Sequence, residues 1–343
     1  LNVKMQKVSL FACFLFVGSA YSWEVGLWIE QPRVSPIRQT AISQNKPFDS
    51  RSQLDVFSAM GGAKKEIFPG ISMKDYLSPG KPDGKYKYLA PFHDQGEPVL
   101  PLAGPSNKTI VTCNQTGQFS IYQSDRYGFN NPDIAWDSKT LDVIFLGGYF
   151  IHDSCRDTGT RLVDLVRNRY PQSLNLAYDG HGPPAMLGTL REYALNYKPK
   201  VVVWVLHEIS MIARLRKEMK SEVISKYLEE GYSQNLNQIQ PYLDKNLDKF
   251  LSNYVKKYSQ KKRQMARDAH HHSVFSKFVR GLKFQRVRLK LKLFTWYRGE
   301  NEYLCEPSTP GADWTANLES VISLAKSEIE PWNGELLVVY FPS

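Results

Sequence analysis

Residues 141–210 constrain the fold most, because short apolar runs alternate there with runs of helical length. The apolar runs and the amphipathic runs between them occupy 141–146, 160–167, 173–176, 185–197 and 200–206. This alternation is typical of βαβ units, which build a parallel sheet. Ligands bind such sheets outside the carboxyl ends of the strands. The turns that we expect to form the functional site are therefore 147–154, 178–182 and 207–210.

Several blocks in and around this stretch carry a family resemblance. They are Gly147-Gly148-Tyr149-Phe150, Asn175-Leu176-Ala177-Tyr178-Asp179-Gly180-His181-Gly182-Pro183, Leu190-Arg191-Glu192-Tyr193, Trp204-Val205-Leu206-His207-Glu208, and the segments 124–132 and 231–236. Together they resemble the SGNH/GDSL hydrolases, in particular a bacterial cell-envelope branch linked to glycan modification. The resemblance implies an α/β fold with three α/β/α layers and a mostly parallel sheet, of the SGNH or flavodoxin-like kind.

The chain divides into three expected parts. Residues 1–22 are a signal peptide or anchor, and residues 23–137 are a loop-rich arm with a small β region. Within that region, the runs at 109–112 and 119–122 predict a short antiparallel pair. Residues 138–343 are the α/β domain, with a basic, mostly helical insertion at about 212–298.

The resemblance implies ester hydrolysis or O-acyl transfer on an envelope glycan by a Ser nucleophile, a His base and an oxyanion hole. Tyr149 occupies the family's Ser position, and a phenol with a pKa of about 10 is a poor substitute for an activated hydroxyl. Gly180 matches the oxyanion Gly, whereas Ser210 occupies the position of the oxyanion Asn. The family's Asp-x-x-His pair follows a strand resembled by 336–342 and is not found before Ser343.

Two interpretations of the function follow from these catalytic positions. The first is a degenerate or incomplete esterase or acyltransferase. The second is a non-catalytic factor that binds an acylated glycan or envelope polysaccharide, or associates with a membrane, through the same fold. We expect no cofactor in either case.

Ser154 is a candidate relocated nucleophile. The family's first block often runs Gly-Asp-Ser-Phe-x-His-Gly-Tyr-Cys, whereas this chain runs Gly147-Gly148-Tyr149-Phe150-Ile151-His152-Asp153-Ser154-Cys155, as if two pairs were exchanged. Ser154 would then lie beside His152. The alternative is that Asp153 and Ser154 form a helix N-cap or a turn.

Other polar residues at the strand ends are weaker candidates. His181 and His207 each supply either a base facing the cleft or a hydrogen-bonded structural residue, and Glu208 either supports a turn amide or is a solvated charge. The contiguous triplet at 270–272 does not predict a metal site, because tetrahedral ligands come from spaced positions.

The N-terminal residues predict export to the periplasm, the membrane or the exterior. Residues 5–7 form a short basic region, an apolar run of about 11 residues follows, and Ala20-Tyr21-Ser22 is a plausible cleavage site. An uncleaved anchor is the alternative. The family resemblance implies that Cys113 and Cys155 form a disulfide, and the alternative is free thiols. Two glycosylation sequons, at 107–109 and 114–116, are interpreted as chance.

The positive charge is concentrated in one segment. Of the net charge of +10, residues 256–298 contribute fourteen Lys and Arg against Asp268 alone. Residues 274–294 interleave these charges with Val, Leu and Phe, which suits an anionic membrane surface if the segment is a helix. The alternatives are an insertion that packs on the core and leaves its basic face in solvent, or a strand at 286–294. Because we expect export, we expect no nucleic acid partner.

Overall fold

The protein was examined as a computed structural model. It describes residues 41, 43–45, 47–62, 66–81, 87–115, 117–282 and 314–342. The chain separates into two compact units, of which one holds 1–46 with 254–301 and the other holds 47–253 with 302–343. The sheet, the three turns and the disulfide described below all belong to the second unit.

The centre of this unit is an all-parallel sheet. Its strand order is β9 (Ser173–Asn175), β8 (Val143–Leu146), β10 (Val201–His207) and β11 (Glu335–Phe341). The predicted apolar runs therefore form neighbouring parallel strands, and the α/β class with a parallel sheet is confirmed.

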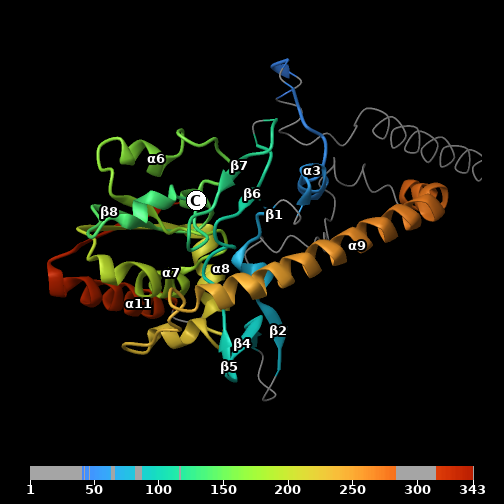
Figure 1. The fold of residues 1–343 in the computed structure, drawn as a ribbon. Helices are drawn as coiled ribbons and strands as arrows, with labels where there is room; N and C mark the ends of the chain where they lie inside the picture. The colour runs from blue at the N-terminus through green and yellow to red at the C-terminus, as the bar shows by residue number, and fades with distance from the viewer. Residues whose placement is uncertain are drawn as a thin grey trace, which may run out of the picture. The chain divides into compact units, whose positions relative to one another are not determined.

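Helices lie on both faces of the sheet (Figure 1). On one face, Val143 and Phe145 of β8 pack in a buried cluster with Val163 of α6 (Leu162–Arg167). The alternate strand residues point to the other face, where α7 (Pro183–Thr189) and α11 (Trp314–Ile329) lie. The largest of these buried side chains is Trp204 of β10. Because successive side chains of a strand point to opposite faces, the sheet has one apolar core on each face.

The run predicted to be helical at 185–197 is a composite. It begins as α7, continues as a π-helical turn (Leu190–Ala194), and ends as a 3-10 turn (Leu195–Tyr197). Two prolines occupy the first turn of α7, where a missing N–H costs nothing. After β10 the chain forms α8 (Glu208–Glu218) and a 3-10 turn (Ile224–Leu228).

The loop-rich arm contains short elements. They are α3 (Gln53–Ala59), β1 (Ile67–Pro69), α4 (Met73–Tyr76), β2 (Ser78–Gly80), β3 (Lys87–Leu89), β4 (Phe92–Asp94), β5 (Glu97–Val99), β6 (Thr109–Val111), β7 (Ile121–Gln123) and a 3-10 turn (Asp133–Asp137). The predicted antiparallel pair is confirmed as β6 and β7. The sequence did not predict that β1 adds to it as a parallel strand.

The C-terminal half of the predicted insertion is only partly described. Helix α9 (Gln240–Leu282) starts with Leu243, Leu247 and Leu251 buried. For residues 265–282 the structure describes the backbone alone, and residues 283–313 lie outside the described part, as does most of the predicted membrane-binding segment 274–294. Among the described helices, none is both long and apolar enough to cross a bilayer.

Candidate functional site at the carboxyl edge of the sheet

The three predicted turns meet at the carboxyl edge of the sheet. The amide of Tyr178 donates a hydrogen bond of 3.1 Å to the carbonyl of Gly147, which joins the turns after β8 and β9. The ring of Phe150 stacks on that of His207, the last residue of β10, with centroids 4.5 Å apart. Segments distant in sequence therefore form one surface, as the alternation of elements predicts.

The turn after β8 begins the short helix α5 (Tyr149–His152), for which Gly148 is the N-cap. Tyr149, at the predicted nucleophile position, is 38% exposed. Its hydroxyl contacts the side-chain amide of Gln115 and lies 3.1 Å from the Sγ of Cys155. Burial, and next the charge of Asp179, raise the pKa of Tyr149. The phenol is therefore neutral at physiological pH and is tied to its neighbours.

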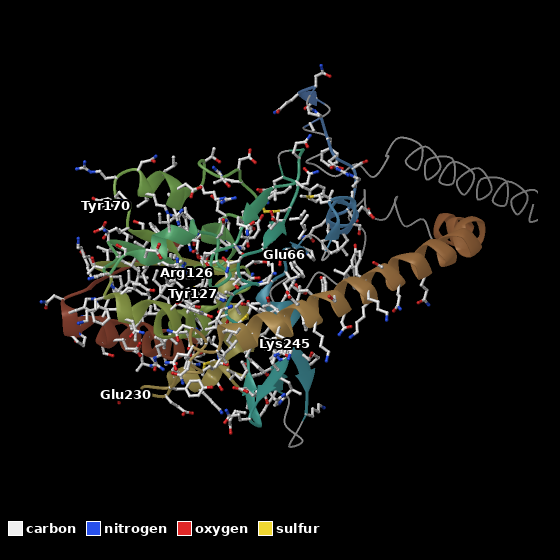
Figure 2. All side chains as sticks on the ribbon, in the orientation of Figure 1. Glu66, Arg126, Tyr127, Tyr170, Glu230 and Lys245 are labelled. Atoms are coloured by element: carbon white, nitrogen blue, oxygen red, sulfur yellow. A yellow bond between two sulfur atoms is a disulfide. The ribbon has the colours of Figure 1, made fainter. Side chains whose placement is uncertain are left out.

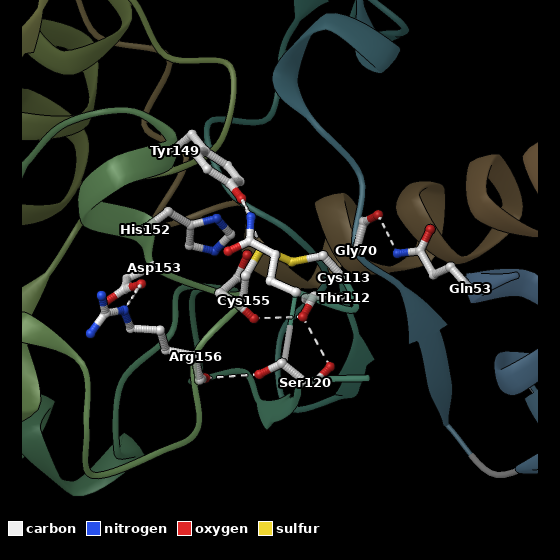
Figure 3. Close-up of a disulfide and its surroundings, with 12 residues drawn as sticks. Gln53, Gly70, Thr112, Cys113, Ser120, Tyr149, His152, Asp153, Cys155 and Arg156 are labelled. Carbon is white, nitrogen blue, oxygen red and sulfur yellow. Dashed lines mark hydrogen bonds and ion pairs between the residues drawn. A yellow bond between two sulfur atoms is a disulfide. The ribbon is translucent and has the colours of Figure 1, made fainter. Parts of the chain in front are cut away.

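The disulfide beside Tyr149 joins Cys113 to Cys155, which confirms the pairing that the family resemblance implies (Figure 3). Because Cys155 is oxidised, its sulfur accepts the hydrogen bond and the Tyr149 hydroxyl donates it. The disulfide connects the loop after β6 to the turn after α5.

Ser154 lies behind this surface. Asp153 ends α5 in a left-handed conformation, with φ of 45°, so Asp153 and Ser154 form a turn at the C-terminus of the helix and not an N-cap. Ser154 is buried, and its carbonyl accepts a hydrogen bond of 2.5 Å from Thr112. In the described part of the chain, no hydrogen bond joins its hydroxyl to the ring of His152.

The two histidines in the first two turns are interior residues. His152 packs between the rings of Tyr122 and Tyr178, and its Nε2 lies 3.4 Å from the Tyr122 hydroxyl. Burial lowers the pKa of His152 to about 4 and that of His181 to about 3. Both rings are therefore neutral at pH 7. His181 is buried, and the hydrogen-bonded structural role predicted for it stays a prediction.

The turn after β9 packs on the arm. Gly180 has φ of +97°, and a Cβ there would lie 2.6 Å from both Met73 Cβ and Ser72 Oγ. The carbonyl of Asp179 accepts hydrogen bonds from the Met73 amide and the Ser72 hydroxyl, at 2.8 and 3.2 Å. Its carboxylate lies 3.6 Å from the guanidinium of Arg214 on α8.

Glu218 supports the same turn from the end of α8. Its carboxyl oxygens accept hydrogen bonds from the amides of Gly182 and Ala185, at 2.6 and 3.1 Å. Burial raises the pKa of Glu218 to about 7 despite these donors. The sequence analysis missed this residue, because nothing local marks a glutamate eleven positions beyond β10 as a partner of the second turn.

The turn after β10 is the least defined of the three. Ser210 lies in the first turn of α8, and its side chain is not described. Glu208 lies beside the Tyr340 hydroxyl of β11, whose pKa is raised by burial and by a hydrogen bond with this carboxyl. Glu208 therefore connects the ends of two neighbouring strands.

Residues of the blocks at 124–132 and 175–183 form a buried hydrogen-bond network that holds α5. The side-chain amide of Asn175 donates a hydrogen bond of 2.7 Å to the carbonyl of Ile151. The side chain of Asn131 forms hydrogen bonds with both the backbone amide and the backbone carbonyl of Asn175. Asn131 in turn donates 2.8 Å to Asp125, which is fully buried. Burial raises the pKa of Asp125 to about 6. These residues position the first turn, although the sequence alone assigned them no role.

The second pair of blocks is joined by Glu192. This buried carboxylate accepts hydrogen bonds from the Tyr227 hydroxyl and from the amides of Gln234 and Leu236, at 2.6, 2.5 and 2.8 Å. The carboxylate of the block at 190–193 therefore holds the loop at 231–236.

The carboxyl edge thus offers aromatic faces and hydrogen-bonding groups. Within the described residues, neither His152 nor His181 is hydrogen-bonded to a serine or threonine hydroxyl, and the hydroxyl that His152 contacts is that of buried Tyr122. No group of three His, Cys, Asp or Glu side chains in the described part of the chain is placed to hold a metal ion. When the chain was compared with family models, curated proteins and solved structures, no match was found.

Proposed function

We propose that this chain is a degenerate SGNH-like protein of the cell envelope that binds a glycan without cleaving its esters. The single observation that carries the proposal is Tyr149, which stands in the nucleophile turn with its phenol tied to Gln115 and Cys155. The ancestral activity is ester hydrolysis or O-acyl transfer.

The chemistry of the turn supports binding over catalysis. Acyl transfer needs an activated oxygen nucleophile and a base within hydrogen-bond reach. The pKa of Tyr149 is raised and not lowered, and His152 lies under the surface against Tyr122. Ser154, the other candidate nucleophile, is buried. Of the predicted oxyanion positions, Gly180 serves to pack the second turn against Met73.

The architecture and the cysteines support the rest of the proposal. A parallel sheet with α6 on one face and α7 and α11 on the other fits a three-layer SGNH-like arrangement (Figure 1). The disulfide between Cys113 and Cys155 fits an exported protein, because disulfides persist in oxidising compartments. Association of segment 274–294 with anionic membranes stays a prediction.

Labelling with a fluorophosphonate tests the absence of an activated serine. We expect no covalent labelling of the chain, whereas an active serine esterase in the same assay is labelled. Peptide mapping would locate any adduct. The proposal is wrong if the chain is labelled in such a way that Ser154→Ala abolishes the label and the control variant Ser225→Ala keeps it. That result would show an activated serine at position 154. Ser225 is a partly buried serine whose hydroxyl bonds the Ser221 carbonyl.

A further inference from the structure

Two adjacent aromatic side chains are exposed at the carboxyl edge of the sheet. Tyr149 is 38% and Phe150 57% exposed. Their rings stand nearly perpendicular, at 79°, with centroids 6.1 Å apart. The two rings form a corner, which we call the aromatic corner. Two aromatic rings that are exposed side by side offer an apolar face together with the polar tip of a tyrosine.

The aromatic corner is held in place before any ligand arrives. Phe150 covers the ring of His207, with 35° between the ring planes. Tyr149 is anchored at its hydroxyl by Gln115 and by the sulfur of Cys155 (Figure 3). Because these contacts restrict both rings, little free energy is spent on ordering side chains when a ligand stacks on them.

Polar groups flank the aromatic corner. Asp179 follows Tyr178, whose amide bonds the Gly147 carbonyl beside this corner at 3.1 Å. The Asp179 carboxylate lies 3.6 Å from the Arg214 guanidinium. Both side chains keep partial exposure, 31% for Asp179 and 22% for Arg214. Gln115 is exposed beside the Tyr149 hydroxyl. Donors and acceptors of hydrogen bonds therefore lie next to an apolar aromatic face.

We infer that the aromatic corner binds a pyranose ring by stacking, with Asp179 and Arg214 taking its hydroxyl groups. Such a ring presents axial C–H groups on a flat face and hydroxyls around its rim. The negative face of an aromatic ring attracts the C–H groups, and a carboxylate and guanidinium match the hydroxyls. The inference rests on the proposed function and adds to it the place at which the sugar binds.

Calorimetric titration of the full chain with defined oligosaccharides tests this inference. The probes are cellohexaose, chitohexaose and β-1,4-galactohexaose. We expect binding, and we expect Phe150→Ala to weaken it by about tenfold. The matched control is Tyr170→Ala, because Tyr170 is 49% exposed at the surface beyond α6 (Figure 2).

The possible results separate this inference from the proposed function. If the probes bind and the two variants behave alike, the aromatic corner is not the site, while glycan binding stands. If none of the probes binds, the ligand class is wrong, although an unlabelled chain still supports a non-catalytic scaffold. Circular dichroism checks that Phe150→Ala, a change at an exposed position, leaves the fold intact.

Discussion

At the scale of single residues, buried polar groups shape this edge more than any exposed reactive group does. Asp125 is the clearest case. It accepts hydrogen bonds from the amides of Tyr127 and Phe129 on one oxygen, and from Asn131 and the Trp136 indole on the other. All four distances are 2.8 or 2.9 Å. Through Asn131 this carboxyl holds Asn175 and so the turn that carries Tyr149.

We predict that Asp125→Asn lowers the free energy of unfolding by about 3 kcal/mol. The new amide nitrogen would face two of the four donors and leave them without an acceptor. Urea denaturation of the variant measures the loss. The control is Asp137→Asn, because Asp137 is 60% exposed in its ion pair with Arg126 and such pairs contribute about 1 kcal/mol or less. Equal losses in the two variants would contradict the role of Asp125.

Sequence reasoning located the turns but not these supports. Apolar period and turn residues are local signals, so the turns at 147–154 and 178–182 were predictable. The four donors to Asp125 come from a loop and from the second half of a 3-10 turn, and Glu218 reaches the second turn from another helix. Such contacts depend on tertiary packing, and no spacing in the chain encodes them.

At the scale of elements, the turn after β9 depends on a close approach to the arm. Gly180 combines a positive φ with a site at which a Cβ would lie 2.6 Å from Met73 Cβ and 2.7 Å from the Met73 amide nitrogen. Gly159 has nearly the same φ, +90°, but nothing lies within 4 Å of its would-be Cβ. The two glycines therefore separate backbone strain from loss of space.

We predict that Gly180→Ala destabilises the protein by several kcal/mol, whereas Gly159→Ala costs about 1 kcal/mol. The difference measures the contact between the second turn and residues 72–73. Thermal denaturation followed by circular dichroism supplies both values. Should the two variants unfold at the same temperature, the turn does not pack against the arm as described.

The elements themselves were predicted unevenly. The strands β8, β9 and β10 and the β6–β7 pair follow from apolar runs and turn residues. The run at 185–197 has the period of one helix, yet it changes to π and 3-10 geometry where Glu192 turns inward to bind the loop at 234–236. The parallel pairing of β1 with β6 joins segments about 40 residues apart, and no local sequence pattern predicts it.

At the scale of the whole molecule, apolar sequence and burial diverge at β11. Leu336 to Phe341 is apolar on both faces, the pattern of an interior parallel strand, and the strand pairs with β10 over seven residues. Nevertheless Leu337, Val338, Val339, Tyr340 and Phe341 are 37–50% exposed. A strand can therefore be predicted from its residues, whereas its position in the sheet follows from the order of the chain connections.

The disulfide is the covalent link between the small β region and the α/β part, and we predict that its loss weakens the whole unit. Cys113 and Cys155 are 42 residues apart, and closing a loop of that length contributes about 4 kcal/mol by restricting the unfolded chain. Urea denaturation of the double variant Cys113→Ser, Cys155→Ser should show a loss of up to that size.

The same measurement in a dithiol reductant separates the bond from the side chains. The oxidised parent should become less stable when reduced, whereas the double variant should not respond, because the reductant then has no bond between these two positions to cleave. Reduction also changes the sulfur that accepts the hydrogen bond from the Tyr149 hydroxyl. If the parent unfolds at the same urea concentration with and without reductant, the link between the two parts does not limit stability, and packing of the β6–β7 pair on α5 must hold them together instead.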